Sequence, residues 1–287
     1  MKSAAPKLQP AHDCVPLIGK SLDELRELAA SLGEPSYRGA QIYRELYARR
    51  QTRIEKMTAL PAEMRRRIAE TARVGLPEIA RRHRSADGTV RYVLRCTGTM
   101  TGMREEKTAA IETVFMPEEK RQTICISTQE GCAVNCQFCL TATLGLVRNL
   151  TAGEIVGQIL VALEDNRETL KPQTNVVLMG QGEPLLNYEA VMKALTIILD
   201  PKGLGISPKH ATLSTSGIVP GIEKLAKDKD AAEAGDFAEC FDGRTARRDH
   251  AGQPKISDCE AAGGLPELSV ASVGASDVRI CSAGRIQ

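Results

Sequence analysis

Three cysteines that lie close together, Cys132, Cys136 and Cys139, are the residues of this chain best suited to chemistry. Thiolate is the usual protein ligand of iron–sulfur clusters, and spacings of three and two residues let all three sulfurs reach one cluster. A 4Fe-4S cluster held by three cysteines keeps one iron without a local protein ligand, and such an open position receives a substrate or cofactor. The spacing therefore predicts a 4Fe-4S cluster with one exchangeable position.

Two plainer interpretations stay open beside the cluster, a structural zinc site and buried free thiols. A zinc site needs a fourth Cys or His nearby, and the next such residue after Cys139 is His210. The chain has nine cysteines, an odd number, and their clustering is more typical of metal ligands or catalytic residues than of disulfides.

The composition indicates a folded protein. The chain has 287 residues, of which 42% are hydrophobic and 26% charged, which is enough for one large or two smaller domains. It contains no apolar run of about 18 residues and no charged-then-apolar signal at its start, so we expect no membrane segment and a cytoplasmic location.

The first 90 residues predict a small helical domain. Ser21 and Glu24 form a capping box at the start of one helix, a second helix follows at about 38–48, and a third begins near Pro61. This segment has 17 Lys and Arg against 11 Asp and Glu, a net charge of +6, with basic clusters at 49–53, 65–67 and 81–84. The clusters suit either nucleic acid binding or a solvated helix face, and the sequence alone leaves both open.

Residues 91–120 predict a linking β-hairpin. The Asp87-Gly88 turn precedes an alternating strand at 89–95, and a second strand runs over 110–116. Glu112 lies in this second, mostly apolar strand. Its carboxylate is either on the exposed face or held for chemistry.

Residues 121–229 alternate between strands and helices. Strands at 122–127, 175–180 and 211–215 are each followed by an amphipathic helix, which predicts a parallel sheet with right-handed crossovers. Ligands collect at the carboxyl ends of such strands. Three polar stretches fall there: Cys132–Cys139, Gly180–Pro184 and Ser214–Gly217.

These stretches resemble the signatures of radical S-adenosylmethionine (SAM) enzymes, in which a cysteine loop follows the first barrel strand and a Gly-Glu-Pro motif follows the second. In a longer context the chain resembles the radical SAM adenine C2 methyltransferases of 23S ribosomal RNA and transfer RNA, from about residue 18 to residue 229. The segments that carry this closer resemblance are Ile111–Val114, Cys125 seven residues before Cys132, Asn175–Asn187 and Thr212–Gly217.

The resemblance implies an α/β fold, a partial (βα) radical SAM barrel that stops after about three βα units, with a small N-terminal helical domain. It also implies that the three cysteines hold the 4Fe-4S cluster and that Gly182, Glu183 and Ser214 bind S-adenosylmethionine. Without the resemblance, Gly182 suits a plain strand-to-helix turn and Ser214 a strand-end hydroxyl.

The resemblance further implies a relay in which a cysteine near the C-terminus carries the methyl group to carbon 2 of an adenine. Glu112 would be the general base and Cys125 the resolving cysteine, although by itself Cys125 suits a small buried hydrophobe. The implied partners are RNA, held by the basic N-terminal domain of a monomer, and an electron donor such as a flavodoxin or ferredoxin. The alternatives are a catalytically incomplete RNA-binding remnant and another radical SAM enzyme that acts on a protein.

Residues 230–287 do not match this family and have the composition of a disordered tail without a strand. The family would continue with a strand ending in Ser-Leu-His or Ser-Leu-Asn and with an Ala-Cys-Gly segment. Cys240, Cys259 and Cys281 have other surroundings and are not assigned the methyl-carrying role. The abrupt change suggests a tail translated out of frame. The hypothesis fails if no reading frame of the gene past codon 229 encodes the missing strand.

Overall fold

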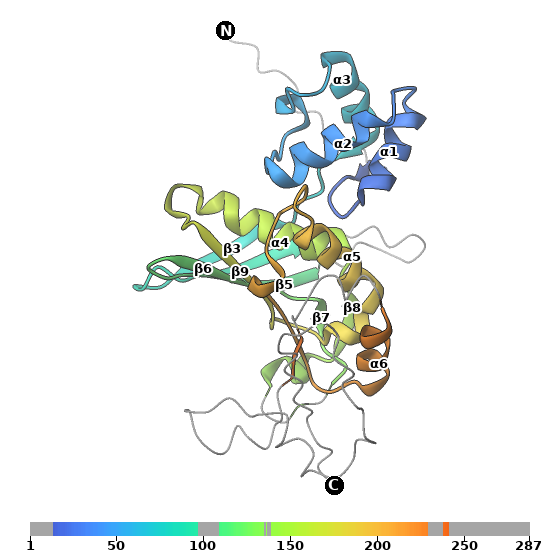
Figure 1. Ribbon diagram of the computed structural model, residues 1–287. Coiled ribbons are helices and arrows are strands. Elements are labelled where there is room, and N and C mark those ends of the chain that lie inside the picture. Colours follow the sequence, from blue (N-terminus) through green and yellow to red (C-terminus); the bar gives the residue numbers. More distant parts are fainter. Residues whose placement is uncertain (1–13, 97–108, 135, 137–138, 229–237, 241–287) are drawn as a thin grey trace.

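The computed structural model describes residues 14–96, 109–134, 136, 139–228 and 238–240. Figure 1 shows a helical bundle beside a twisted sheet, with helices packed on one face of that sheet. The mixed α/β architecture and the small helical N-terminal region agree with the sequence prediction. No helix in the described ranges is both long and apolar enough to cross a membrane.

The bundle contains α1 (Leu22–Ser31), α2 (Tyr37–Tyr43) and α3 (Ala62–Thr71). The predicted capping box is present: Ser21 Oγ accepts the Glu24 N–H at 3.2 Å, and the Glu24 carboxylate accepts the Ser21 N–H at 2.7 Å. The predicted second helix is only partly α-helical, because a π-helical turn, Arg44–Ala48, continues α2.

Seven strands form the main sheet in the order β11-β10-β9-β6-β5-β4-β3. The four strands from β6 to β11 pair in parallel, as the alternation of strands and helices predicts, and β6, β5, β4 and β3 pair antiparallel. The bounds are β3 Glu78–Arg84, β4 Val90–Cys96, β5 Ala109–Pro117, β6 Arg121–Cys125, β9 Gln173–Leu178, β10 Ala211–Thr215 and β11 Ala238–Cys240. A separate two-stranded pairing joins β1 (Val15–Pro16) to β2 (Ala72–Arg73).

The two strands of the expected linking hairpin, β4 and β5, pair antiparallel and are part of the main sheet. β5 pairs directly with β6, with Val114 opposite Cys125, so β3, β4 and β5 extend the core sheet. The turn at Asp87-Gly88 joins β3 to β4, and the basic run 81–84 is therefore a strand and not part of a helix face. The division of the chain at residues 90, 120 and 229 stays a prediction.

The absence of a strand from the tail was also a wrong prediction. Residues Ala238–Cys240 form β11, which pairs in parallel with Leu213–Thr215 of β10. A parallel edge strand presents unpaired N–H and C=O groups, and a short segment of almost any composition can satisfy them. Residues 241–287, which include Cys259 and Cys281, lie outside the described residues, and so does most of the segment that the out-of-frame hypothesis concerns.

Helices α4 (Ala152–Asp165) and α5 (Tyr188–Leu199) cover one face of the sheet, and α6 (Val219–Lys227) follows β10 (Figure 1). Alternate strand residues such as Ile124, Val176 and Leu213 are fully buried on that face. Their neighbours point to the opposite side, because successive side chains of a strand alternate. We call this opposite side the open face.

A buried glutamine joins α4 to two strands. Gln158 Oε1 accepts hydrogen bonds from Thr113 Oγ1 and the Ser127 N–H, both at 2.8 Å. Its Nε2 donates to the carbonyls of Ser127 at 2.8 Å and Glu154 at 3.2 Å. Gln158, Thr113 and Ser127 are all fully buried. A buried polar group is tolerated when it is fully hydrogen-bonded, and Gln158 meets this condition.

We expect Gln158→Leu to lower the free energy of unfolding by about 3–6 kcal/mol, because it leaves the Thr113 hydroxyl and the Ser127 N–H and C=O without partners. Urea denaturation measures the change. The matched control on the same helix is Glu164→Gln, which breaks only an exposed ion pair to Arg167 and should cost less than about 1 kcal/mol. Equal effects of the two substitutions would show that the buried network does not matter for stability.

Candidate active site

The polar segments at the carboxyl ends of β6, β9 and β10 contact one another. The Gly180 N–H donates to the Ile126 carbonyl at 3.0 Å, and the Thr128 N–H donates to the Gln181 carbonyl at 2.8 Å. Ser216, after β10, donates to Glu183, after β9. Two of the three predicted stretches, Gly180–Pro184 and Ser214–Gly217, therefore lie together beside the segment that leads from β6 toward the cysteine loop.

The cysteine loop is closed at its base by a small antiparallel ribbon that the sequence analysis did not predict. β7 (Gln129–Gly131) pairs with β8 (Leu146–Asn149), and the Cys132 N–H donates to the Gly145 carbonyl at 3.0 Å. Gly131 has a φ of +73°, and a Cβ atom there would lie 1.7 Å from the Gly145 oxygen. Only glycine allows this close approach.

An ion pair fastens the ribbon to α4. The guanidinium of Arg148 binds both carboxylate oxygens of Glu154 at 2.7 and 2.9 Å. Glu154 is also the N3 residue of a second capping box, whose Thr151-Ala152-Gly153-Glu154 pattern is present in the sequence, and its carboxylate accepts the Thr151 N–H at 2.8 Å. A bidentate pair of this kind fixes direction as well as distance, so the start of α4 holds the base of the cysteine loop.

The three cysteines of the loop are free and half-buried. Burial raises the pKa of the Cys132 thiol, and the negative charges of Glu183 and Cys139 raise it further. Burial likewise raises the pKa of Cys136, with contributions from Cys139, Cys132 and Glu183. Gln129, whose side chain accepts the Glu183 N–H, begins β7 directly before Cys132, so Glu183 lies beside the base of the cysteine loop.

The three cysteine thiols are chemically suitable ligands for an iron–sulfur cluster. Thiolates that repel one another are stabilised by a bound cation, and metal binding drives their deprotonation. In the described ranges, no three His, Cys, Asp or Glu side chains lie close enough together to hold a metal ion. Ligation would therefore draw the three sulfurs closer than they are in this structure.

Glu183 is a buried carboxylate without a cationic partner among the described residues; its side chain is only 4% exposed. Its Oε2 accepts the Ser216 N–H at 2.7 Å and the Ser216 hydroxyl at 2.8 Å, and its Oε1 accepts the Leu185 N–H at 3.1 Å. These donors fix the carboxylate, but they carry no positive charge, and the site is therefore suited to a cationic group. Sequence reasoning missed Ser216, which only its place in Ser214–Gly217 could have suggested.

Gly182 lets the β9 loop lie against the segment after β6. Its φ is +102°, and a Cβ atom there would lie 2.6 Å from Cβ and 2.7 Å from N of Gln129. Gln129 Oε1 accepts the Glu183 N–H at 2.9 Å, so the same side chain supports the next residue. Beside them, the buried Gln181 Oε1 and Thr128 Oγ1 have no hydrogen-bond partner in the described part of the chain.

The remaining predicted residues lie along the sheet. Ser214 is half-buried near the carboxyl end of β10, on the open face. Cys125 pairs with Val114, two residues from Glu112, so the side chains of Glu112 and Cys125 share the open face. Burial raises the pKa of the Cys125 thiol, which keeps it protonated at neutral pH.

Glu112 is held through both its backbone and its side chain. The Ser127 hydroxyl donates to the Glu112 carbonyl at 2.7 Å and accepts the Gln181 N–H at 2.9 Å. The Glu112 carboxylate is about half exposed and lies 3.6 Å from the Arg91 guanidinium. Ser127 thus connects the strand of Glu112 to the loop that contains Gly182 and Glu183.

The chain is similar to known proteins in both its N-terminal segment and its core. The radical SAM superfamily profile matches residues 126–235, and that of the ribosomal RNA large subunit methyltransferase N-terminal domain matches residues 15–74. The dual-specificity RNA methyltransferase RlmN of Rhodopseudomonas palustris (strain BisB18) is 44% identical over 224 residues, covering 74% of this chain and 55% of that protein. The protein of the same name from Anaeromyxobacter dehalogenans (strain 2CP-C) is 42% identical, covering 76% and 58%.

Over the matched residues the chain is similar to the RlmN family of radical SAM methyltransferases. A crystal structure of a radical SAM methyltransferase from Sphaerobacter thermophilus agrees, with a TM-score of 0.66 and 37% identity over 75% of this chain and 60% of that one. Similarity to the superfamily implies a 4Fe-4S cluster and S-adenosylmethionine as cofactors. The chain spans a little over half the length of the curated RlmN relatives that it matches.

We expect Gly182→Ala to destabilise the site far more than Gly205→Ala does. Both glycines have positive φ, which costs an alanine about 1–2 kcal/mol. At Gly205 a Cβ atom meets nothing closer than 3.8 Å, whereas at Gly182 it collides with Gln129 and should cost about 1–3 kcal/mol more. Urea denaturation of both variants measures the difference, and equal losses would contradict the close approach.

The coupling energy between the Ser216 hydroxyl and the Glu183 carboxylate can be measured by a double-mutant cycle of unfolding free energies. Ser216→Ala removes a hydroxyl donor from a buried carboxylate and should cost about 1–3 kcal/mol. In a Glu183→Gln background the same change should cost about 1 kcal/mol less, because the charge is gone. Additive effects would show that the two side chains are not coupled.

Proposed function

We propose that this chain is a radical SAM methyltransferase that modifies carbon 2 of an adenine in 23S rRNA, tRNA or both. The observation that supports this most is a loop of three thiols beside a buried, fixed carboxylate that has no cationic partner among the described residues. It offers a place for an iron cluster beside a place for a positively charged ligand. The names of the relatives, which are RNA methyltransferases, supply the class of substrate.

Each residue of the site receives a role in this proposal. Cys132, Cys136 and Cys139 would hold the cluster, and Gly182, Glu183 and Ser214 would hold S-adenosylmethionine. Bound there, these cofactors supply reductive radical chemistry. Glu183 would accept a charge-assisted hydrogen bond from the cofactor's ammonium group. The hydrogen bonds from Ser216 and Leu185 fix the orientation of the Glu183 carboxylate.

Glu112 and Cys125 would serve the methyl transfer from the open face. Glu112 has an exposed carboxylate that can take a proton from carbon 2 of a base placed on that face. Cys125 would act as the resolving thiol, and burial raises its pKa. We assign no residue of this chain as the methyl-carrying cysteine.

The reaction would also need partner molecules and a cellular location. The partners would be RNA and an electron donor of the flavodoxin or ferredoxin kind, and the chain would work as a monomer in the cytoplasm, where both RNAs are made. The N-terminal helical segment would be the domain that the RNA methyltransferase profile describes.

The test is anaerobic reconstitution of the chain with iron and sulfide, followed by assays of cofactor cleavage and of 2-methyladenosine in RNA. We expect a cluster in the unsubstituted chain and in Cys14→Ala, and none in Cys139→Ala. Glu112→Gln should keep cofactor cleavage and lose methylation by a factor of about 100 or more, because a general base contributes that much.

The other outcomes separate the alternatives. Absence of a cluster from the unsubstituted chain would overturn the proposal. Cofactor cleavage and RNA binding without methylated adenine would indicate a catalytically incomplete RNA-binding remnant. Cofactor cleavage without RNA binding would favour a radical enzyme that acts on a protein.

A further inference from the structure

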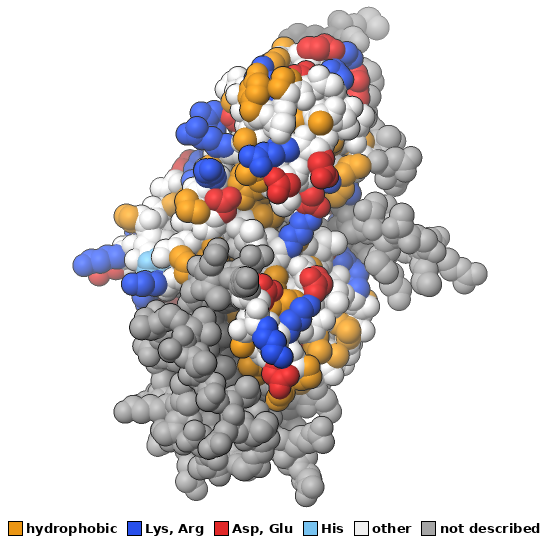
Figure 2. Space-filling model, turned by 45° about the vertical axis from the view of Figure 1, so that its right-hand side comes forward, with side chains coloured by type: hydrophobic (Ala, Val, Ile, Leu, Met, Phe, Trp, Pro, Cys, Tyr) orange, Lys and Arg blue, Asp and Glu red, His pale blue; other side chains and the backbone are white. Residues whose placement is uncertain are grey.

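Several arginines of the helical bundle are ion-paired, whereas others, such as Arg44, Arg53 and Arg65, have no ion pair among the described residues. Arg66 pairs with Glu63 and Glu70, and further ion pairs join Arg49 to Glu45 and Arg67 to Glu34. Figure 2 shows basic and acidic side chains interspersed over the bundle. Such a mixed surface attracts a polyanion only weakly, because neighbouring opposite charges cancel beyond about one Debye length.

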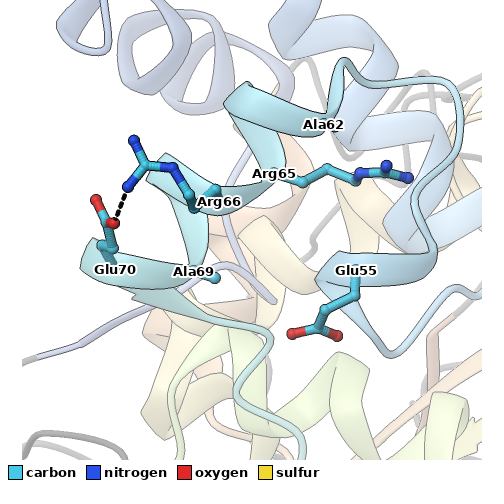
Figure 3. A pocket seen from close by; sticks show the side chains of 6 residues that line it. All are labelled: Glu55, Ala62, Arg65, Arg66, Ala69 and Glu70. Carbon is cyan, nitrogen blue, oxygen red and sulfur yellow. Dashed lines mark hydrogen bonds and ion pairs between the residues drawn. The ribbon is translucent and has the colours of Figure 1, made fainter.

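The hollow on the bundle has the same mixed character. A cavity of about 420 Å³ lies beside α3. In Figure 3 the Arg66 guanidinium, at the edge of this cavity, points to the Glu70 carboxylate. Its lining residues are Glu55, Ala62, Arg65, Arg66, Ala69 and Glu70. Two acids among two bases leave the hollow without a net positive charge.

Strands β3 and β4 divide their basic residues between the two faces of the sheet. Arg82 pairs with Asp165 of α4 at 3.0 Å, and Arg84 donates to Asn166 at 3.4 Å, so both point to the helix-covered face. Their neighbours in the alternation lie on the open face. The pairing register places His83 opposite Arg91, and Arg81 opposite Val93, which itself lies opposite Glu112.

Four basic side chains therefore share the open face with Glu112, and we call them the basic face: Arg81, His83, Arg91 and Arg95. All four residues are exposed. Within the described part of the chain Arg81 and Arg95 have no ion-pair partner, although Glu78 lies opposite Arg95 in the register, and Arg91 has only the 3.6 Å pair to Glu112. Arg81 and Arg95 thus keep charge on this face that no ion pair neutralises within the described residues.

We propose that the basic face binds the phosphate backbone of RNA and so presents a base to Glu112. This inference rests on the proposed function. Arg81 and Glu112 stand two strands apart, a distance of roughly 10 Å. An unstacked nucleotide can bridge that distance with its base at Glu112 and its phosphates at the arginines. The ion-paired arginines of the bundle, such as Arg66 and Arg67, would contribute less of the electrostatic attraction.

The test measures RNA binding by the full chain against salt concentration, using fluorescence anisotropy of a labelled tRNA transcript. The variant Arg81→Gln with Arg95→Gln removes two phosphate contacts from the basic face. It should reduce the slope of log Kd against log salt by about 1.5 and weaken binding at least tenfold at moderate salt. The matched control is Arg66→Gln with Arg67→Gln on the bundle, which should leave the slope nearly unchanged because both arginines are ion-paired.

A second variant keeps the charge: Arg81→Lys with Arg95→Lys should retain the slope, because a lysine also neutralises one phosphate. An unchanged slope in the Gln variant of the basic face, or a larger loss in the bundle variant, would overturn the proposed surface while leaving the proposed function in place. Absence of RNA binding by the unsubstituted chain would instead overturn the proposed function, and the surface with it.

Discussion

The hydrogen bonds of Ser127 and Gln158 hold the structure together at the point where its parts meet. Gln158 contributes from α4, Thr113 from β5 and Ser127 from the end of β6, and the Ser127 hydroxyl continues to the loop after β9. All of these groups are removed from water, so each missing partner would cost the full desolvation of the other. The positions of Glu112, of the cysteine loop and of Glu183 therefore depend on one another.

Negative charge is the second constraint on the site. The Glu183 carboxylate and the thiols of Cys132 and Cys136 lie within electrostatic reach, and burial weakens the screening between them. The protein fixes this arrangement with neutral donors, such as the hydroxyl and N–H of Ser216, and not with a basic residue of the described chain. A site of this kind gains stability when positively charged groups enter it, which is the property that an iron cluster and a sulfonium cofactor require.

The basic residues differ in whether an acidic side chain neutralises their charge. On the bundle, glutamates three or four residues away on the same helix neutralise Arg49 and Arg66, a pattern that stabilises helices. On the sheet, alternation sends Arg82 and Arg84 to α4, where they have structural partners, and leaves Arg81 and Arg95 on the open face. A count of charges along the sequence treats all of these arginines alike, although the fold gives them different roles.

The sequence by itself determined the strands and helices of the core, both capping boxes and the cysteine spacing, because these follow from local periodicity and local hydrogen bonding. It also indicated the similarity to this family, through motifs at strand ends. Only the tertiary structure decided that β3, β4 and β5 continue the core sheet, that β7 and β8 close the cysteine loop, and that β11 borders β10. Strand pairing, the clamp of Ser216 on Glu183 and the collision that forbids a side chain at Gly182 join residues far apart in the chain. No local pattern records such contacts, because their energies arise only when the segments are packed together.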